Sequence, residues 1–413
     1  MDYGLIGEKL SHSYSKQIHA LIGDYSYDIK NIAPDALSAF FAQRDFKGIN
    51  VTIPYKKAVI PLCDTLLSVA QRLGSVNTIT ADKDGTLRGD NTDYFGFTYM
   101  AQKAGISFEG KNVLILGSGG TGITVEAVAL DAGAAKVTIV SRGGPVNYSN
   151  VYELCGDTQI VINATPVGMY PNTAGSPVAL EKFPNCCGVL DVIYNPLFSR
   201  LLLEARRLGI PHANGLAMLA AQAKESADLF FGQEIVPKKS VDEIVRELTL
   251  DCTNIVLTGM PGGGKTTVGK ALTALTGRAF ADTDELIEHE AGTTTAELFE
   301  RYGEEYFRNL EAQAVERIGK EKGLIISTGG GAVLRDENRL NLKQNGFVVF
   351  VQRDPKKLAL RGRPLSTDLT AMAEKRLPIY RANCDIIVDN DSTPDVVAKE
   401  IWHSFLEHDF LKR

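Results

Sequence analysis

The sequence predicts an α/β protein with mainly parallel sheets and more than one domain. Short apolar segments rich in β-branched residues alternate with helical segments along almost the whole chain, which is typical of parallel sheets covered by helices. Two glycine-rich loops each follow such an apolar segment and precede a helical one. The length of 413 residues is too great for one compact core, so we expect two or three domains.

The individual elements follow from the pattern of apolar residues. Several expected strands are almost continuously apolar, as strands that helices cover on both faces are. In chain order, the expected strands are Tyr3–Gly7, Gly48–Ile53, Asn112–Leu116, Lys136–Ser141, Ile160–Asn163, Gly188–Val192, Asn254–Thr258, Leu324–Ser327 and Phe347–Val351. The expected helices include Leu216–Phe231, Val241–Leu248, Gly303–Lys322 and Pro355–Arg361.

Charge and composition exclude several classes of protein. The 44 Lys and Arg residues against 50 Asp and Glu leave a net charge of −6, so there is no overall positive field with which to bind nucleic acid. No apolar run approaches the ~20 residues of a membrane span, and the first residues lack the pattern of a secretory signal. The six cysteines lack C-x-x-C spacing, so we expect reduced thiols in the cytoplasm.

The second glycine-rich loop, residues 259–266, fits the pattern G-x-x-x-x-G-K-[ST] and opens a helix expected at Thr267–Leu275. Glycines allow backbone N–H groups to surround phosphate oxygens, and the helix N-terminus adds positive potential. Lys265 is expected to reach the β- and γ-phosphates, and the Thr266 hydroxyl to bind Mg²⁺. The expected ATP-binding residues are Gly259, Gly262, Gly263, Gly264, Lys265, Thr266 and Thr267.

Two carboxylates follow this loop at Asp282 and Asp284. On a strand their spacing would point both side chains the same way, toward the metal and the phosphoryl acceptor. The alternative is a helix N-cap at Asp284. Further along stand F-R-x-x-E (residues 307–311), three glycines (329–331), R-P-L (363–365) and R-x-P-x-Y (376–380).

These motifs, in this order, make residues 254–408 resemble shikimate kinase. The resemblance implies that Asp282 supports Mg²⁺ and that Asp284 orients the acceptor hydroxyl. It also implies that Arg308 and Arg376 clamp the substrate carboxylate beside Gly330 and Gly331, and that Arg363 lies in a lid over the transferred phosphate. A single residue separates Arg361 from Arg363 and the segment to Arg376 is short, so the lid is trimmed relative to the family pattern and either arginine is a candidate for charge stabilisation.

The first glycine-rich loop, Gly117-Ser118-Gly119-Gly120-Thr121-Gly122, fits G-x-G-x-x-G. This pattern is weak alone, but a strand leads into it and a helix, expected from Thr121 to about Ala132, follows it. The second strand of the unit ends in Ser141 and Arg142, where an NAD-binding domain carries Asp or Glu. A hydroxyl and a guanidinium suit a 2′-phosphate, so the sequence favours NADP. The stretch from Arg142 to Asp157 is short, so we expect a reduced helix there.

Polar residues upstream of this loop suit the reduction of a ketone. Lys56 follows an expected strand, and Asp93 lies in the turn-rich segment G-D-N-T-D. Hydride transfer to a carbonyl requires a proton donor near the developing alkoxide, and a lysine beside a carboxylate suits that role.

Residues 3–250 resemble shikimate dehydrogenase through seven ordered motifs, among them S-Y-S (13–15), N-V-T-I-P-Y-K (50–56), V-N-T (76–78), N-A-T-P-V-G-M (163–169) and the segment 215–222. The resemblance implies a catalytic pair of Lys56 and Asp93. It implies that Ser13 and Ser15 bind the carboxylate, and that Thr52, Asn77, Tyr194 and Gln222 hold the hydroxyls and ring. It places Thr165, Met169 and Gly215 at the nicotinamide. Lys16 stands where the family frequently has proline.

The sequence therefore predicts a bifunctional cytoplasmic enzyme of aromatic precursor biosynthesis. A substrate-binding domain is expected at residues 1–98 and 211–250, an NADP-binding Rossmann domain at 99–210, and a P-loop kinase domain, similar to nucleoside-monophosphate kinases, at 252–413. The expected reactions are NADPH-dependent reduction of 3-dehydroshikimate and phosphorylation of shikimate by MgATP. The alternatives are a quinate dehydrogenase joined to another small-molecule kinase, and a ligand-sensing regulator without catalysis; the presence of Lys56, Asp93, Lys265 and Asp284 opposes the latter.

Overall fold

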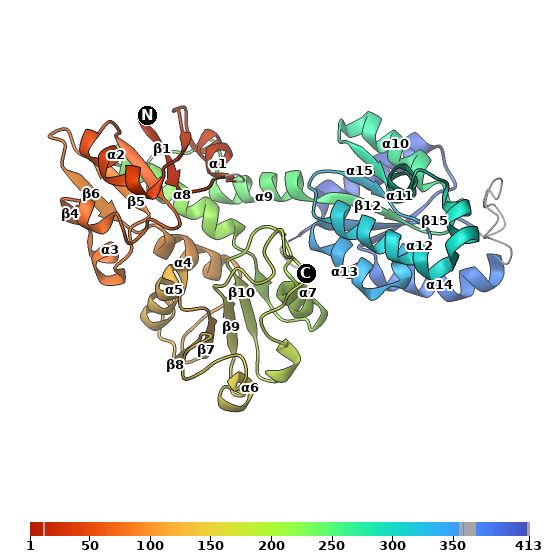
Figure 1. Ribbon diagram of the computed structural model, residues 1–413, viewed down its shortest axis with the longest axis horizontal. Coiled ribbons are helices and arrows are strands. Elements are labelled where there is room, and N and C mark those ends of the chain that lie inside the picture. The colour runs from red at the N-terminus through yellow and green to blue at the C-terminus, as the bar shows by residue number, and fades with distance from the viewer. Residues whose placement is uncertain (11–12, 355–357, 359–368, 411–413) are drawn as a thin grey trace. The chain divides into compact units, whose positions relative to one another are not determined.

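The structure is a computed structural model that describes residues 1–10, 13–354, 358 and 369–410 (Figure 1). Its contacts divide the chain into two compact units. Unit 1 comprises Met1–Val167, Ser176–Tyr194 and Glu204–Glu247, and unit 2 comprises Gly168–Gly175, Asn195–Leu203 and Leu248–Arg413. Each unit is described by itself.

The helices of the described residues are, in chain order, α1 Ser15–Ile22, α2 Leu37–Gln43, α3 Ser68–Leu73, α4 Asp93–Lys103, α5 Gly120–Asp131, α6 Val151–Leu154, α7 Arg200–Arg207, α8 Leu216–Phe231, α9 Val241–Cys252, α10 Lys265–Thr276, α11 Thr283–Ala291, α12 Thr295–Gly319, α13 Asp336–Gln344, α14 Leu369–Asn383 and α15 Pro394–Glu407. Short 3₁₀ helices occur at Pro34–Ala36, Ile60–Leu62, Leu180–Lys182 and Ala332–Leu334. Within this part of the chain, no helix combines the length and the apolar character needed to cross a bilayer.

Unit 1 contains two sheets. The first has the strand order β2-β1-β3-β5-β6-β4 and is mixed, because β5 runs antiparallel to both of its neighbours. The second has the order β11-β10-β9-β7-β8 and is wholly parallel. The strands are β1 Tyr3–Gly7, β2 Asp28–Asn31, β3 Gly48–Val51, β4 Thr65–Leu66, β5 Thr78–Ala81, β6 Leu87–Asp90, β7 Asn112–Leu116, β8 Lys136–Val140, β9 Ile160–Asn163, β10 Gly188–Asp191 and β11 His212–Ala213.

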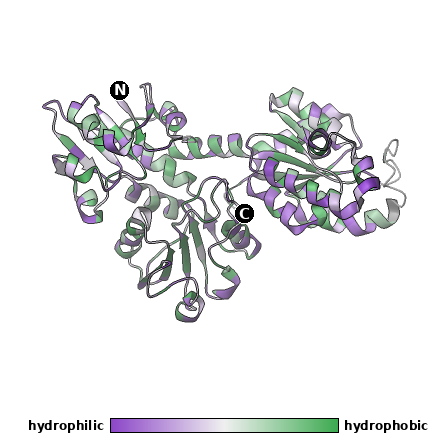
Figure 2. Ribbon diagram, viewed as in Figure 1, coloured by the Kyte–Doolittle hydropathy of each residue, from purple (hydrophilic) through white to green (hydrophobic). Residues whose placement is uncertain are grey.

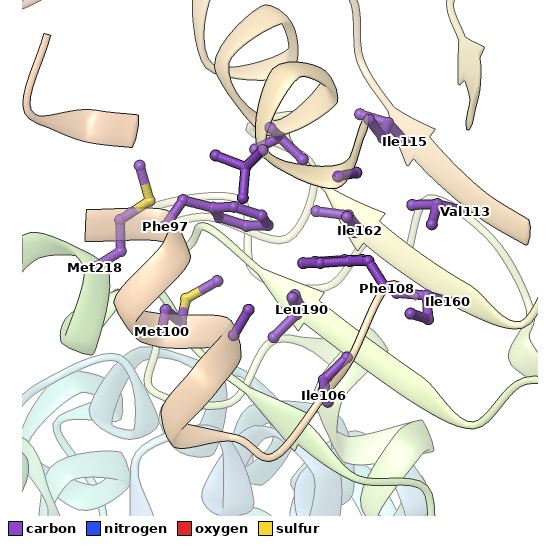
Figure 3. Packing of buried hydrophobic residues seen from close by; sticks show 14 residues of the cluster. Phe97, Met100, Ile106, Phe108, Val113, Ile115, Ile160, Ile162, Leu190 and Met218 are labelled. Carbon is purple, nitrogen blue, oxygen red and sulfur yellow. The ribbon is translucent and has the colours of Figure 1, made fainter. Parts of the chain in front are cut away.

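A hydrophobic core joins the parallel sheet of unit 1 to α4 and α8 (Figure 3). Phe97 and Met100 of α4 and Met218 of α8 pack with Ile115 and Ile162 on the sheet. The two helices therefore connect the glycine-rich loop after β7 with the residues carried by the first sheet. Helix α8 also contacts β3 and β5 of the first sheet, so this packing links the two sheets of unit 1.

Unit 2 contains a parallel sheet of the order β13-β14-β12-β15-β16 with helices on both faces (Figures 1 and 2). Its strands are β12 Asn254–Thr258, β13 Phe280–Asp282, β14 Ile325–Ser327, β15 Gly346–Gln352 and β16 Ile386–Asp389. Residues of α10 and α15 pack on one face, and residues of α12 and α13 on the other. The glycine-rich loop at 259–264 leaves the carboxyl end of the central strand β12, where parallel α/β sheets bind ligands.

The α/β class and the parallel sheets are confirmed, and most strands lie within one or two residues of their predicted positions. The helix predicted at Gly303–Lys322 corresponds to the second segment of α12; α12 as a whole begins at Thr295, because Thr294 and Glu297 form a capping box. Its backbone is interrupted at Gly303, which has a φ of 81°. The helix at Val241 continues to Cys252, and the short α6 agrees with the expected reduction after β8. Apart from Leu358, which is not helical, the segment Pro355–Arg361 lies outside the described residues.

Candidate active sites

The first candidate site contains an ion pair between Lys56 and Asp93. Lys56 follows β3, and Asp93 is the first residue of α4. Lys56 Nζ lies 2.6 Å from Asp93 Oδ2, with the lysine side chain 20% exposed and the aspartate 6% exposed. A carboxylate at a helix N-terminus is stabilised by the helix dipole. Asp93 therefore holds the Lys56 ammonium in position, and the ammonium is the more exposed member of the pair.

Asn77 and Gln222 lie beside this pair. Asn77 Nδ2 donates to Gln222 Oε1 at 3.4 Å, and the backbone of the preceding residue, Val76, donates to the carbonyl of Lys56 at 2.8 Å. The N–H of Thr92, which precedes Asp93, donates to Asn77 Oδ1 at 2.7 Å. The structure therefore brings Lys56, Asp93, Asn77 and Gln222 together, although they come from four separate parts of the sequence.

The other predicted substrate residues lie near the ends of three elements of unit 1: α1, β3 and β10. The Ser13 hydroxyl donates to the Ser15 hydroxyl at 2.9 Å, at the start of α1. Thr52 follows β3 and is half-buried. Tyr194 follows β10, its ring lies 5.6 Å from that of Tyr14, and burial raises the pKa of its hydroxyl. At ordinary pH the Tyr194 hydroxyl is thus a proton-bearing hydrogen-bond donor.

The loop after β7 has the geometry of a phosphate-binding turn. Gly117 has a φ of 109°, which favours glycine. A Cβ on Gly122 would lie 2.3 Å from the Gly117 carbonyl oxygen, so the turn admits no side chain there. The positions of Gly119 and Gly120, beside Ser118 and Thr121, are open at the N-terminus of α5. An anion can therefore approach the backbone N–H groups closely.

The remaining predicted dinucleotide contacts lie at the ends of other strands. Ser141 and Arg142 follow β8, and Arg142 is exposed, as a group that binds a phosphate from solvent must be. The side chain of Thr165 would touch a Cβ on Gly117. A Cβ on Gly215 would lie 2.0 Å from the Val192 carbonyl oxygen, so only glycine fits there. Met169 is exposed and belongs to the segment that clusters with unit 2. These residues suit NADP(H), whose 2′-phosphate requires a cation such as Arg142.

In unit 2, Lys265 begins α10 and lies inside the glycine-rich loop. Its Nζ donates to the carbonyl oxygens of Gly259 and Met260, at 3.0 and 3.1 Å, and the residue is 7% exposed. Gly262 and Gly264 have φ values of 77° and 91°. The loop is therefore wound around an ammonium group, with a helix N-terminus next to it. This donor set fits the phosphates of ATP.

Thr266 and Asp282 form an oxygen pair next to this loop. The Thr266 hydroxyl donates to Asp282 Oδ2 at 2.9 Å, and Asp282 Oδ1 accepts from the N–H of Asp284 at 3.0 Å. Two protein oxygens suit Mg²⁺, which keeps several waters and binds substrate phosphates. Among the described residues there is no group of three or more His, Cys, Asp or Glu side chains that would hold a metal ion without such help.

The prediction that Asp282 and Asp284 lie together on one strand is wrong. Asp282 ends β13, whereas Asp284 lies in the first turn of α11. The predicted alternative, an N-cap at Asp284, is also wrong, because Asp282 is the N-cap and its side chain binds the Asp284 N–H. The cap turns the chain from strand to helix between the two carboxylates. Only Asp282 contacts Thr266, while Asp284 lies near Gly329.

Arg308 is held against the triple glycine. Its guanidinium is 12% exposed and bonds to Glu311 at 2.8 Å and to Glu304 at 3.2 Å. A Cβ on Gly331 would lie 2.1 Å from Arg308 Nη1, so this glycine makes room for the guanidinium. Sequence reasoning quoted Glu311 within a motif but gave it no role. Burial raises the pKa of Glu311, although Arg308 opposes that effect.

Tyr380 completes this pocket. Its hydroxyl donates to the carbonyl oxygen of Gly330, and its side chain neighbours Arg376. Burial raises the pKa of Tyr380 to about 12, although Arg376 opposes the effect. The positive charge of Arg376 also opposes the rise that burial causes in the pKa of Glu311, after the larger effect of Arg308. The predicted lid residues Arg361 and Arg363 lie outside the described residues. The two sites define an oxidoreductase with a dinucleotide-binding sheet and a P-loop phosphotransferase in one chain.

The chain belongs to the shikimate dehydrogenase family and also carries a shikimate kinase domain, which makes it a bifunctional enzyme of the shikimate pathway. Residues 5–79 match the shikimate dehydrogenase substrate binding domain, and residues 261–406 match shikimate kinase. The chain is 35% identical over 272 residues to a shikimate dehydrogenase (NADP(+)) of Clostridium perfringens, covering 60% of this chain and 97% of that protein.

Solved structures agree with this assignment for the first part of the chain. A chorismate mutase/shikimate 5-dehydrogenase fusion protein from Clostridium acetobutylicum is 33% identical with a TM-score of 0.56, and the match covers 60% of this chain and 96% of that one. Shikimate 5-dehydrogenase from Thermus thermophilus, in complex with NADP(H) and shikimate, is 30% identical with a TM-score of 0.53, covering 60% and 99%.

Proposed function

We propose that unit 1 catalyses the NADPH-dependent reduction of 3-dehydroshikimate to shikimate, and that the kinase domain phosphorylates shikimate at the same C3 oxygen with MgATP. The observation that carries the first reaction is the close pair of Lys56 and Asp93 beside Asn77. We also propose the boundaries 1–98 with 211–250, 99–210, and 252–413 for the three domains. A cytoplasmic location agrees with six cysteines that no disulfide joins.

In the dehydrogenase reaction, NADPH supplies the hydride. The Lys56 ammonium donates a proton to the C3 oxygen as negative charge develops there, and Asp93 holds the ammonium in place. Ser13 and Ser15 provide two adjacent hydroxyls for the substrate carboxylate. Thr52, Asn77, Tyr194 and Gln222 provide hydroxyl and amide groups for the ring oxygens. The exposed Arg142, with Ser141, binds the 2′-phosphate of the dinucleotide.

In the kinase reaction, ATP with Mg²⁺ supplies the γ-phosphoryl group. Asp284 orients the acceptor hydroxyl, and Thr266 and Asp282 hold the metal. Arg308 and Arg376 bind the substrate carboxylate beside Gly330 and Gly331, because a planar guanidinium matches a carboxylate in two parallel hydrogen bonds. Lys265 exchanges its carbonyl partners for phosphate oxygens, and Arg363 stabilises the charge of the transferred group.

The test is to incubate the purified full chain with 3-dehydroshikimate, NADPH and MgATP and to identify the products. We expect NADPH oxidation and shikimate 3-phosphate. Omission of ATP should leave shikimate, and omission of NADPH should leave 3-dehydroshikimate unchanged. Turnover of quinate with NAD⁺ in preference to shikimate with NADP⁺ would overturn the dehydrogenase assignment, and ligand binding without turnover would favour a regulator.

A further inference from the structure

A cluster of buried polar side chains lies behind Asn77. It consists of Thr78 on β5, Thr92 before α4, Ser226 on α8 and Asn50 on β3. The three hydroxyl oxygens lie 3.0–3.1 Å from one another. Asn50 Nδ2 donates to Thr78 at 3.0 Å and to Ser226 at 2.8 Å. Thr78, Thr92 and Ser226 are at most 2% exposed.

Hydrogen bonds from Thr78 and Thr92 fix the orientation of the Asn77 side-chain amide. Asn77 Oδ1 accepts from the backbone N–H of Thr92 at 2.7 Å, and only an oxygen can accept from that group. The hydroxyls of Thr78 and Thr92 donate to the same oxygen at 3.1 and 3.2 Å. Asn77 Nδ2 is therefore on the other side, toward Gln222, with a second N–H left for another acceptor. A rotated amide would set Nδ2 against the Thr92 N–H, which can only donate, and would lose the hydrogen bonds from the two hydroxyls.

The Asn50 side chain orients the hydroxyl protons of Thr78 and Ser226. Asn50 Oδ1 accepts from the Tyr27 hydroxyl at 2.7 Å, so its nitrogen faces the cluster. Because this nitrogen donates to Thr78 and Ser226, their own protons point onward. Thr78 donates to Asn77 Oδ1, and Ser226 donates to the backbone carbonyl of Gln222 at 2.8 Å. Thr78 and Ser226 thus each accept on one side and donate on the other, an arrangement in which hydrogen bonds strengthen one another.

The aromatic residues behind Asn50 hold this arrangement without adding charge. The rings of His19 and Tyr27 stack with centroids 3.8 Å apart, and His19 Nδ1 lies 2.6 Å from the Tyr25 hydroxyl. Burial lowers the pKa of His19 to about 3, so the ring is neutral at ordinary pH. The network therefore runs from a neutral aromatic cluster to the amide at the candidate site.

We infer that Thr78, supported by Asn50 and Ser226, is a positioning residue that acts with the backbone N–H of Thr92 to hold the Asn77 amide so that its N–H, and not its carbonyl oxygen, faces the substrate. This inference rests on the proposed function, in which Asn77 binds a ring oxygen of shikimate. The inference adds that the substrate must offer a hydrogen-bond acceptor, an oxygen lone pair, to the N–H of Asn77. Thr78 acts through Asn77 and does not touch the substrate.

The experiment compares Thr78→Val, which removes the hydroxyl at nearly constant shape, with Thr78→Ser, which retains it. Shikimate oxidation is measured at saturating NADP⁺. We expect Thr78→Val to raise KM for shikimate about tenfold, which is the effect of one lost buried hydrogen bond. We expect Thr78→Ser to remain within about twofold of the wild type. KM for NADP⁺ should not change in either variant. Thr98→Val, which removes a hydroxyl that donates to the helix carbonyl of Tyr94 at 2.8 Å, is the matched control and should leave both KM values unchanged.

If Thr78 had a purely structural role, Thr78→Val would lower the thermal midpoint without raising KM for shikimate selectively over KM for NADP⁺. Shikimate analogues that lack the C4 or the C5 hydroxyl give a second readout. For one of the two, the ratio of KM between Thr78→Val and wild type should fall to about one, because the oxygen that Asn77 binds is absent. A ratio that stays near ten for both analogues would overturn the inference.

If Thr78→Val does not fold, Ser226→Ala provides the same test with a smaller expected rise in KM, of about threefold. An unchanged KM for shikimate in Ser226→Ala would overturn the inference. Failure of the positioning inference is distinguishable from failure of the proposed function. Absence of shikimate oxidation by the wild-type protein removes the proposed function, whereas an active wild type with equal KM values in Thr78→Val and Thr78→Ser removes only the positioning role.

Discussion

The ion pair of Lys56 and Asp93 allows the proposed chemistry and the stability of the fold to be tested separately. Lys56→Ala removes both the proton donor and the partner of a carboxylate that is 6% exposed. Lys56→Arg keeps a positive charge against Asp93, but a guanidinium does not release its proton at any pH the protein tolerates. The two variants should therefore agree in their effect on catalysis and differ in their effect on stability.

The structure sets the size of both effects. Loss of a general acid reduces the rate by about 10²–10⁴-fold, equivalent to about 3–5 kcal/mol of transition-state stabilisation. Breaking a buried pair costs about 3–5 kcal/mol of stability, and the 20% exposure of Lys56 with the position of Asp93 at the start of α4 places this pair near the lower end. We expect Lys56→Ala to lower both kcat and the free energy of unfolding, and Lys56→Arg to lower kcat alone.

The assay is the initial rate of NADPH formation from shikimate and NADP⁺, with urea denaturation of the same preparations. Lys47→Ala is the matched control, because Lys47 and Asp2 form a pair at the same 2.6 Å distance with side chains 63% and 61% exposed. Lys47→Ala should change neither quantity measurably. A Lys56→Arg variant that keeps kcat within tenfold of the wild type would refute the role of Lys56 as proton donor.

Three further predictions concern other residues. Lys265→Ala should abolish shikimate-dependent ATP consumption and leave shikimate oxidation by the same preparation unchanged; loss of both activities would contradict two separate sites. Gly331→Ala should raise the kinase KM for shikimate about tenfold or more and lower the thermal midpoint, because the new Cβ would lie 2.1 Å from Nη1 of Arg308 and displace the guanidinium from buried Glu311; an unchanged KM would count against the clamp. Between pH 7 and pH 5 the wild type should lose about 2 kcal/mol of its free energy of unfolding, measured by urea denaturation, through the neutral His19. This loss should be absent in His19→Phe. It should persist in His403→Gln, which changes an exposed histidine.

The sign of the His19 effect follows from the direction of its pKa. Burial lowers the pKa of His19 from 6.5 to about 3, so the folded chain keeps the ring neutral. Below pH 6.5 the unfolded chain takes up a proton that the folded chain excludes. The contribution to stability is therefore present above pH 6.5 and is lost as the pH falls toward 3.

Local patterns in the sequence were sufficient for the elements and loops that depend on neighbouring residues. The strand Asn112–Leu116 and the helix Leu216–Phe231 occur at their predicted bounds, since continuous apolar runs and helical periodicity are local properties. The start of α12 had a local signal in Thr294 and Glu297, a capping box that sequence reasoning did not use. Asp284 was misplaced because the strand was expected to include it, whereas β13 ends at Asp282, whose side chain caps α11.

Contacts between distant segments had no comparable signal. Asn50 and Ser226 are 176 residues apart and meet only because α8 packs beside β3. Glu311 lies in a helix where its spacing from Arg308 is that of an ordinary surface pair, and its burial follows from the triple-glycine segment at residues 329–331 packing against it. Sequence patterns therefore predicted which residues bind a ligand, and the fold was needed to find the residues that contact them.

The two candidate sites are built on the same physical plan. In each, the group expected to meet the substrate is bonded to a more deeply buried partner: Lys56 to Asp93, Asn77 to Thr92, and Arg308 to Glu311. A flexible side chain that is already held in its binding geometry loses little entropy when the substrate arrives, so more of the interaction energy contributes to binding and rate. The partner also excludes the competing orientations, as the Thr92 N–H does for the Asn77 amide. Substitution of the buried partner should therefore alter KM or kcat without any direct contact to substrate, and this is the property by which positioning residues differ from residues that only stabilise the fold.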